Sequence, residues 1–187
     1  MPELRRWSPM RLFVATIIAA ATFGACFVLG NAITVALGPG MSGIATIIVT
    51  TILVVVGARI VETRGVFTLM VFLFTVLAIP TNMFGPPGPH KAIIGIVTGL
   101  VYDGVWNVTG RRSWSLFLAA ALATACSIFL IFGLMVILEY PRADYLRAML
   151  KYLVPAYAAL GWIGAMLGNR IYETSLRELS LVKQLRA

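Results

Sequence analysis

The sequence contains little charge for its length. Of its 187 residues only 12% are charged and 60% are hydrophobic, whereas soluble domains carry about 25% charged residues. Asp, Glu, Lys, Arg and His are all absent from 12–58, 65–89, 113–138 and 152–169. Uncharged stretches of roughly 18 residues or more are typical of membrane-spanning helices. The composition therefore excludes a soluble fold, because too few polar residues remain to cover its exterior.

Catalytic and metal-binding patterns are absent as well. There is one histidine, His90, so a paired-histidine zinc site cannot form. The sequence has no Gly-x-Ser-x-Gly and no Walker A run, and Cys26 and Cys126 lie alone in apolar stretches without Cys-x-x-Cys spacing. We therefore expect no enzyme, no cofactor and no metal. Transport would draw its energy from an ion gradient or from another polypeptide.

The apolar stretches predict an all-α integral membrane protein with a bundle of six transmembrane helices in one domain, 1–187. A helix is the only lone segment that satisfies its own backbone hydrogen bonds in lipid. Gly38-Pro39-Gly40 and the Pro/Gly-rich run 80–91 are the strongest breakers. The predicted spans are 12–35, 42–61, 66–79, 92–108, 114–138 and 145–169. The tail 170–187 is predicted to be an amphipathic helix at the membrane surface or against a partner.

The basic residues predict the orientation in the membrane. With the N-terminus inside, eleven of the fifteen Lys and Arg residues lie on the cytoplasmic side and four on the outside. Cytoplasmic loops are enriched in Lys and Arg, so we expect both termini in the cytoplasm of a multi-pass plasma-membrane protein. The net charge of +8 is then explained by contact with anionic lipid, and no nucleic-acid partner is expected.

Asp103 is the one acidic residue placed within a predicted span. A carboxylate at membrane depth costs about 2.5–3.5 kcal/mol on insertion scales, so it usually faces protein or water. One interpretation is a functional, titrating group. The other is a residue near the interface that is satisfied by Tyr102, Asn107 or the arginines at 111–112.

Polar and aromatic residues gather at the outer ends of the later spans and form a candidate substrate pocket. Aromatic rings with a few polar groups in an apolar setting describe a small-molecule site. For each tyrosine alone, an aromatic belt at the interface is the alternative. The candidate substrate-binding residues are Asn82, His90, Glu139, Tyr152, Tyr157 and Trp162.

Small residues recur at helical spacing in several spans. Such stripes let helices approach closely, either within this chain or against another subunit. The pairs are Ala15 and Ala19, Ala21 and Ala25, and Gly95 and Gly99, together with Gly161, Ala165 and Gly168.

The chain resembles the S component of energy-coupling factor (ECF) transporters. The resemblance covers nearly the whole chain and includes its length, six spans and the basic start followed by Ala15 and Ala19. The run Gly95-Ile96-Val97-Thr98-Gly99-Leu100, followed by Asp103, is most similar to the thiamine-precursor (hydroxymethylpyrimidine) type. There the run reads Gly-Ile-Val-Gln-Gly-Leu before a glutamate, so Thr98 and Asp103 are shorter replacements.

The resemblance implies a substrate-capture subunit of an ECF-type importer that binds a vitamin or vitamin precursor from outside. It implies docking of Ala15 and Ala19, or of Ala21 and Ala25 in another register, on a transmembrane coupling subunit that works with ATPase subunits. It also implies a ligand held by the last three helices under a lid at 31–42. The alternative is a proton-coupled carrier or a small homo-oligomeric channel that uses Asp103.

Overall fold

Every regular element of the described residues is a helix. The computed structural model describes residues 6–137 and 143–186. The elements are α1 (Pro9–Leu37), α2 (Pro39–Val61), α3 (Val66–Leu77), α4 (His90–Val108), α5 (Ser113–Ile137), α6 (Ala143–Ile171), the π-helical turn η1 (Tyr172–Leu176) and α7 (Ser180–Arg186). The all-α fold class predicted from the sequence is confirmed.

The six long helices lie where the apolar segments predict them, with ends displaced by at most three residues. Four of them are long and apolar enough to cross a membrane, namely α1, α2, α5 and α6. The other two differ, because α3 has only 12 residues and α4 carries charged side chains. That all six helices span the bilayer therefore stays a prediction.

The connection between α1 and α2 is much shorter than expected. Ser8 caps α1 by accepting a hydrogen bond from the Arg11 amide at 3.3 Å, and α1 then runs to Leu37. Gly38 alone separates it from α2, with φ of 91°, a backbone conformation that favours glycine. The segment 31–42, which the resemblance implies as a lid, is thus almost entirely helical.

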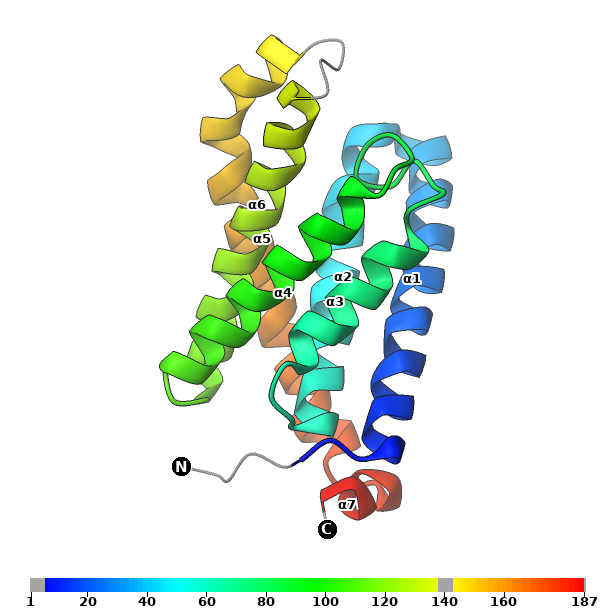
Figure 1. Cartoon of the computed structure of the whole chain (residues 1–187), viewed down its shortest axis with the longest axis vertical. Helices are drawn as coiled ribbons and strands as arrows, with labels where there is room; N and C mark the ends of the chain where they lie inside the picture. Colours follow the sequence, from blue (N-terminus) through cyan, green and yellow to red (C-terminus); the bar gives the residue numbers. More distant parts are fainter. Residues whose placement is uncertain (1–5, 138–142, 187) are drawn as a thin grey trace.

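Helices that follow one another along the chain pack as three antiparallel pairs, α1–α2, α3–α4 and α5–α6. α2 also packs on α6, α4 on α5, and α1 on α3, which closes the bundle. Both termini and α7 lie at one end of the molecule, and the loop between α3 and α4 lies at the opposite end (Figure 1). We call these the terminal end and the loop end.

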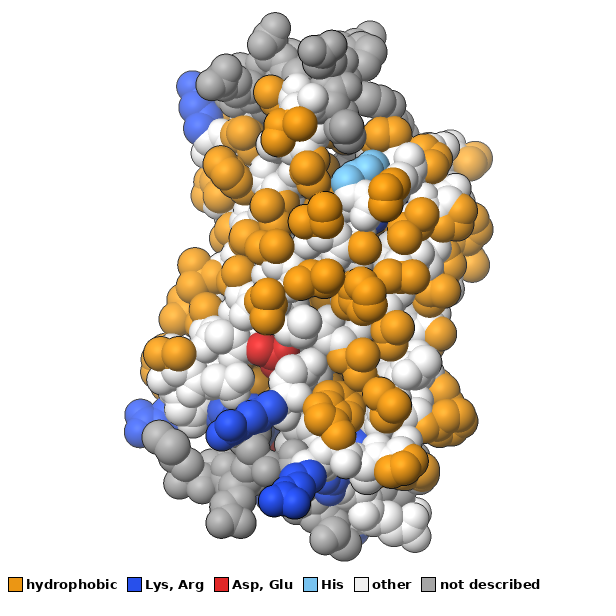
Figure 2. All heavy atoms as spheres, in the orientation of Figure 1, with side chains coloured by type: hydrophobic (Ala, Val, Ile, Leu, Met, Phe, Trp, Pro, Cys, Tyr) orange, Lys and Arg blue, Asp and Glu red, His pale blue; other side chains and the backbone are white. Residues whose placement is uncertain are grey.

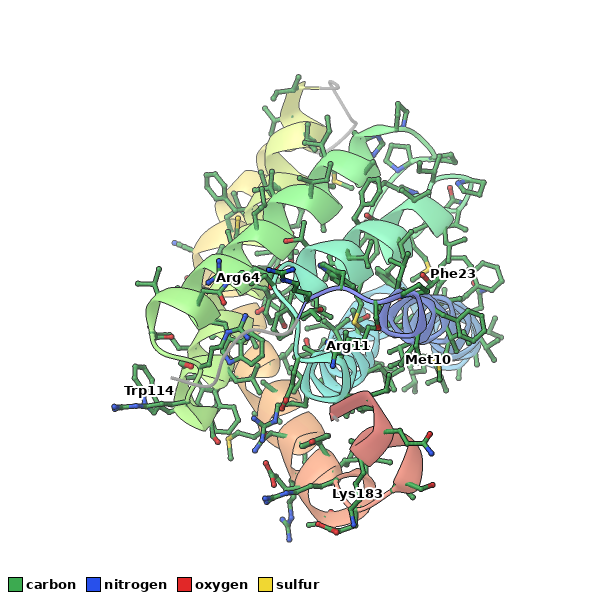
Figure 3. All side chains as sticks on the ribbon, turned by 60° about the horizontal axis from the view of Figure 1, so that its bottom comes forward. Met10, Arg11, Phe23, Arg64, Trp114 and Lys183 are labelled. Atoms are coloured by element: carbon green, nitrogen blue, oxygen red, sulfur yellow. The ribbon has the colours of Figure 1, made fainter. Side chains whose placement is uncertain are left out.

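Hydrophobic side chains cover the outside of the bundle as well as its core. Large apolar residues such as Phe13, Val28 and Phe129 are more than 60% exposed. Figure 2 shows such side chains across the middle of one face, with Lys and Arg mainly towards the terminal end. Figure 3 shows Arg11, Arg64 and Lys183, from three separate segments, at that same end. An apolar belt with a basic end fits a bilayer.

The C-terminal tail folds back onto the bundle. It is helical as predicted, in η1 and α7, and Tyr172, Val182 and Leu185 are buried. The Arg11 guanidinium donates to the Leu185 carbonyl at 2.6 Å, and Arg59 forms an ion pair with Glu173. The chain itself therefore covers part of the apolar side of the tail, whereas Ile171 and Leu179 are exposed.

Glycines let α4 approach α3 more closely than larger residues would. A Cβ at Gly99 would overlap the backbone of Thr68, and one at Gly95 would overlap the Thr75 side chain. Gly161, Gly164 and Gly168 are used in the same way by α6, against α5 and α2. These predicted stripes therefore mediate packing within the chain.

We predict that Gly99→Ala destabilises the protein by about 1–3 kcal/mol, because the new methyl group overpacks the α3–α4 contact. Gly104→Ala is the matched control, since it lies on the same helix and its Cβ would meet nothing within 4 Å. There alanine should stabilise by up to about 1 kcal/mol. Reversible unfolding of both variants in detergent measures the difference, and equal effects would contradict the packing described here.

Candidate functional site

A cavity lies inside the bundle, between α2, α3, α4 and α5, and Phe84 of the loop between α3 and α4 is part of its lining. Its volume is about 70 Å³. The lining residues are Thr46, Ile47, Thr50, Thr51, Val54, Val71, Phe74, Thr75, Phe84, Ile94, Thr98, Tyr102, Thr124, Ser127 and Ile131. Ligand pockets commonly enclose about 300–1,000 Å³, with a few polar groups in apolar walls, so this cavity has the composition of such a pocket and a smaller volume.

Among the described residues, hydroxyl groups are the polar part of this lining, and none of these lining residues is charged. Three of these hydroxyls donate to backbone carbonyls. Thr75 donates to Val71 at 3.0 Å, Thr124 to Ala120 at 2.8 Å, and Ser127 to Thr124 at 2.8 Å. In such a threonine the hydroxyl points at the backbone of its own helix, and the methyl group points away from that bond. The wall of the cavity is therefore mainly apolar.

Thr98 differs from the other hydroxyl residues of the cavity. Its side chain is only 6% exposed, and its Oγ1 has no hydrogen-bond partner within the described part of the chain. A buried hydroxyl without a partner costs roughly 1–3 kcal/mol. Thr98 therefore supplies the cavity with both a donor and an acceptor that the fold does not use.

Phe84 contributes to the cavity from the loop between α3 and α4. Its backbone has φ of 61°, in the left-handed region that non-glycine residues seldom occupy. Its ring packs edge to face on Phe74, with centroids 5.6 Å apart, which is a favourable aromatic geometry. The loop that reaches the cavity is thus the α3–α4 connection, whereas the resemblance implies the segment 31–42.

Asp103 faces the first turn of α3. Its Oδ2 accepts hydrogen bonds from the Thr68 amide at 2.8 Å and from the Thr68 hydroxyl at 2.6 Å. The N-cap residue of α3, Gly65, provides no side-chain bond, and the first amides of a helix need acceptors from elsewhere. Asp103 provides one and also places negative charge at the positive end of α3.

Lys91 performs the equivalent role at the other end of α3. It is fully buried, and its ammonium donates to the Ala78 carbonyl at 3.0 Å and to the Thr81 carbonyl. Ala78 is the C-cap of α3, so the positive charge lies at the negative end of the helix dipole. The acidic and basic side chains buried in α4 thus stabilise α3 at both ends.

Arg111 lies just beyond α4, on the side of Asp103. Its guanidinium donates to the Asn107 side chain at 2.6 Å and stacks on Trp106 at 4.5 Å. Burial lowers the pKa of Arg111, while the Asp103 carboxylate opposes that change. Arg111, one of the two arginines considered from the sequence, therefore contributes to the surroundings of Asp103.

The outer polar and aromatic residues predicted to bind substrate do not line this cavity. Tyr152 is 66% exposed and lies beneath the Lys151 ammonium, and Trp162 packs on Phe117 at 5.7 Å. Asn82 is exposed and His90 is half-buried at the start of α4, beside Gly88. Glu139 lies outside the described residues.

Tyr157 lies nearer the cavity than the other predicted residues. Its backbone carbonyl accepts from the Thr124 hydroxyl of the cavity wall at 3.0 Å. Its own hydroxyl faces Gly43 at the start of α2. A pocket formed jointly by the predicted residues therefore stays a prediction.

Ala15 and Ala19 face the interior of the bundle. They are at most 1% exposed and belong to the core packed between α1, α2 and α3. Their burial leaves no surface for a partner, so docking through these two residues does not fit the structure. The exposed small residues of α1 are one position further along, at Thr16, Ala20 and Gly24, and include Ala21 of the second register.

The described residues contain no group of three or more His, Cys, Asp or Glu side chains that could hold a metal ion. The residues that line the cavity were not selected from the sequence, apart from Thr98 in the quoted run. Their signal is hydroxyl side chains at helical spacing in apolar spans, such as Thr46 and Thr50. Such residues satisfy their own helices so easily that this signal is weak.

No protein-family model matches the chain, and no curated protein matches its sequence. Among solved structures it matches one described as "Crystal structure of an S-component of ECF transporter", with a TM-score of 0.57 and 20% identity. The match covers 97% of this chain and 94% of that chain. The fold is that of an S-component. Together with the four long apolar helices, this fold identifies a multi-pass membrane protein.

We predict that Asp103→Leu destabilises the protein by about 2 kcal/mol or more, because it leaves the α3 amide and the Thr68 hydroxyl without an acceptor. Asp103→Asn retains an acceptor oxygen of the same reach and should cost less than about 1 kcal/mol. Unfolding of both variants in detergent tests this. A leucine variant as stable as the wild type would contradict the capping role of Asp103.

Proposed function

We propose that this chain is the substrate-capture subunit of an ECF-type importer. The observation that carries the proposal is the match of the S-component fold over 97% of the chain, combined with a cavity inside that fold. A capture subunit needs a binding site and a docking surface, and the ATPase partner performs the energy-consuming step. The chain is then a transport binding protein and no enzyme.

The orientation proposed from the basic residues places the cavity on the outer side. Arg59 lies in the last turn of α2, and Arg64, Arg111 and Arg112 lie in the two loops at the terminal end, where both chain ends also lie. Lys and Arg are enriched on the cytoplasmic side of membrane proteins. With the terminal end inside, the cavity and the α3–α4 loop face the outside, as uptake requires.

For the ligand we propose a vitamin or vitamin precursor built on a single uncharged ring, such as hydroxymethylpyrimidine. The sequence run around Thr98 supports this type, and Thr98 lines the cavity. Every lining residue is uncharged, which gives a permanently cationic molecule such as thiamine itself no counter-charge there.

The contacts of Asp103 do not support the alternative of a proton-coupled carrier. Its Oδ2 is engaged by Thr68 at two donors, and Asp103 is absent from the residues lining the cavity. The cap on α3 gives Asp103 a structural role through Oδ2, while its Oδ1 is buried without a hydrogen-bond partner among the described residues. We therefore do not propose a carrier or a channel.

For the docking surface we propose the face of α1 that points away from the rest of the bundle, centred on Thr16, Ala20 and Gly24. These three residues are exposed and spaced four apart, and a Cβ at Gly24 would meet nothing within 4 Å. Small residues at this spacing allow another helix to approach closely in lipid. This surface replaces the buried pair Ala15 and Ala19.

We predict that Gly24→Leu leaves the isolated chain folded but lowers recovery of its complex with the coupling and ATPase subunits by about tenfold. A clash of about 1–3 kcal/mol at a helix interface is sufficient for this. Co-purification of the complex from detergent measures the effect. Ala159→Leu, at an exposed position of α6, is the matched control and should assemble normally.

Failure of the wild-type chain to assemble with any coupling and ATPase subunits would overturn the proposed function. Normal assembly of both leucine variants would instead overturn only the proposed docking surface.

A further inference from the structure

We infer that the cavity between α2, α3, α4 and α5 selects an uncharged ring compound and that Thr98 is its hydrogen-bonding anchor. This inference deepens the proposed function, on which it rests for its biological meaning. It names both the position of the ligand in the fold and the chemistry that the site accepts.

The first step is the lack of charge in the cavity. All fifteen lining residues are apolar or carry a hydroxyl, and they come from four different helices and one loop. Moving a carboxylate or an ammonium group out of water into such a site is strongly unfavourable without a partner of opposite charge. An uncharged molecule meets no such barrier, and its apolar surface gains from leaving water.

The second step is the state of the hydroxyl groups. Those of Thr75, Thr124 and Ser127 are engaged with backbone carbonyls, and Cys26 contacts the Thr50 hydroxyl at 3.1 Å. Among the described residues that line the cavity, only Thr98 has a buried side-chain oxygen without a hydrogen-bond partner. A ligand amide, amino or hydroxyl group is the natural partner for it.

The third step is the shape of the site. Phe74 and Phe84 form an edge-to-face pair in the wall, at a ring distance of 5.6 Å. An aromatic ligand can extend this arrangement with a further ring contact. The cavity volume is about 70 Å³, whereas a cavity of about 150 Å³ is known to bind benzene. A single ring with a small substituent therefore requires the wall to give way, and the α3–α4 loop that carries Phe84 is the part that can move.

The Thr98 hydroxyl is also a cost to the protein in the absence of ligand. Valine has nearly the same shape as threonine and needs no partner, so Thr98→Val should unfold at the same temperature as the wild type or higher. A buried hydroxyl that lowers stability because it has no hydrogen-bond partner, and that faces a cavity, fits a role in ligand binding.

The test uses benzamide, benzoate and benzamidinium, which are similar in shape and differ in charge. Thermal unfolding of the purified full-length chain is measured in nanodiscs with each probe. Benzamide should raise the Tm of the wild type, and the two charged probes should bind at least about 100-fold more weakly. Thr98→Val should weaken benzamide binding by about fivefold, equivalent to one lost hydrogen bond.

Thr63→Val is the matched control. Thr63 is fully buried, its Oγ1 also has no partner within the described residues, and it does not line the cavity. This variant should bind benzamide as the wild type does. Equal binding of a charged probe, unchanged benzamide binding by Thr98→Val, or no response to any probe would each overturn the inference.

The outcome is separable from the proposed function. Assembly with ATPase subunits but no benzamide binding would overturn the inference and leave the capture role standing. Benzamide binding without any assembly would do the reverse.

Discussion

α3 is held by a row of side chains on α4 that recurs every fourth residue. Lys91, Gly95, Gly99 and Asp103 are all buried in this seam. The two glycines bring the helices together, and the two charged residues bond to opposite ends of α3. Lys91 and Asp103 are twelve residues apart on α4, and α3 is 12 residues long, so the two distances match.

This match is required because α3 is short. Twelve residues extend only about 18 Å at 1.5 Å per residue, whereas the hydrocarbon layer is about 30 Å thick. If α3 crosses the bilayer as the sequence predicts, an end of it must lie within the layer, where no water can satisfy its free backbone groups. A charged side chain from the neighbouring helix solves this problem and explains why Lys91 and Asp103 are tolerated at depth. The side chains of Lys91 and Asp103 bond to the two ends of α3. The described side chains that line the cavity between α2 and α5 are uncharged.

Much of the fold follows from the sequence because lipid leaves few choices. An uncharged run such as 113–138 must be helical, and α5 is observed at Ser113–Ile137. The site does not follow in the same way, because burial depends on which face of each helix turns inward. Ala15 and Thr16 are adjacent and both small, yet the first is buried and the second exposed. Thr98 could be recognised in its run, but its missing partner is visible only in three dimensions.

The position of the ligand tests this account most directly. Methyl NMR of the protein labelled at threonine and alanine, with benzamide added, reports which helix faces the ligand contacts. The account predicts shifted signals for the cavity threonines, among them Thr50, Thr75 and Thr98. Signals of Ala156 and Ala159, which are exposed on α6 near Tyr152 and Trp162, should stay unchanged. Shifts confined to these alanines would contradict the account and would place the ligand at the outer aromatic residues.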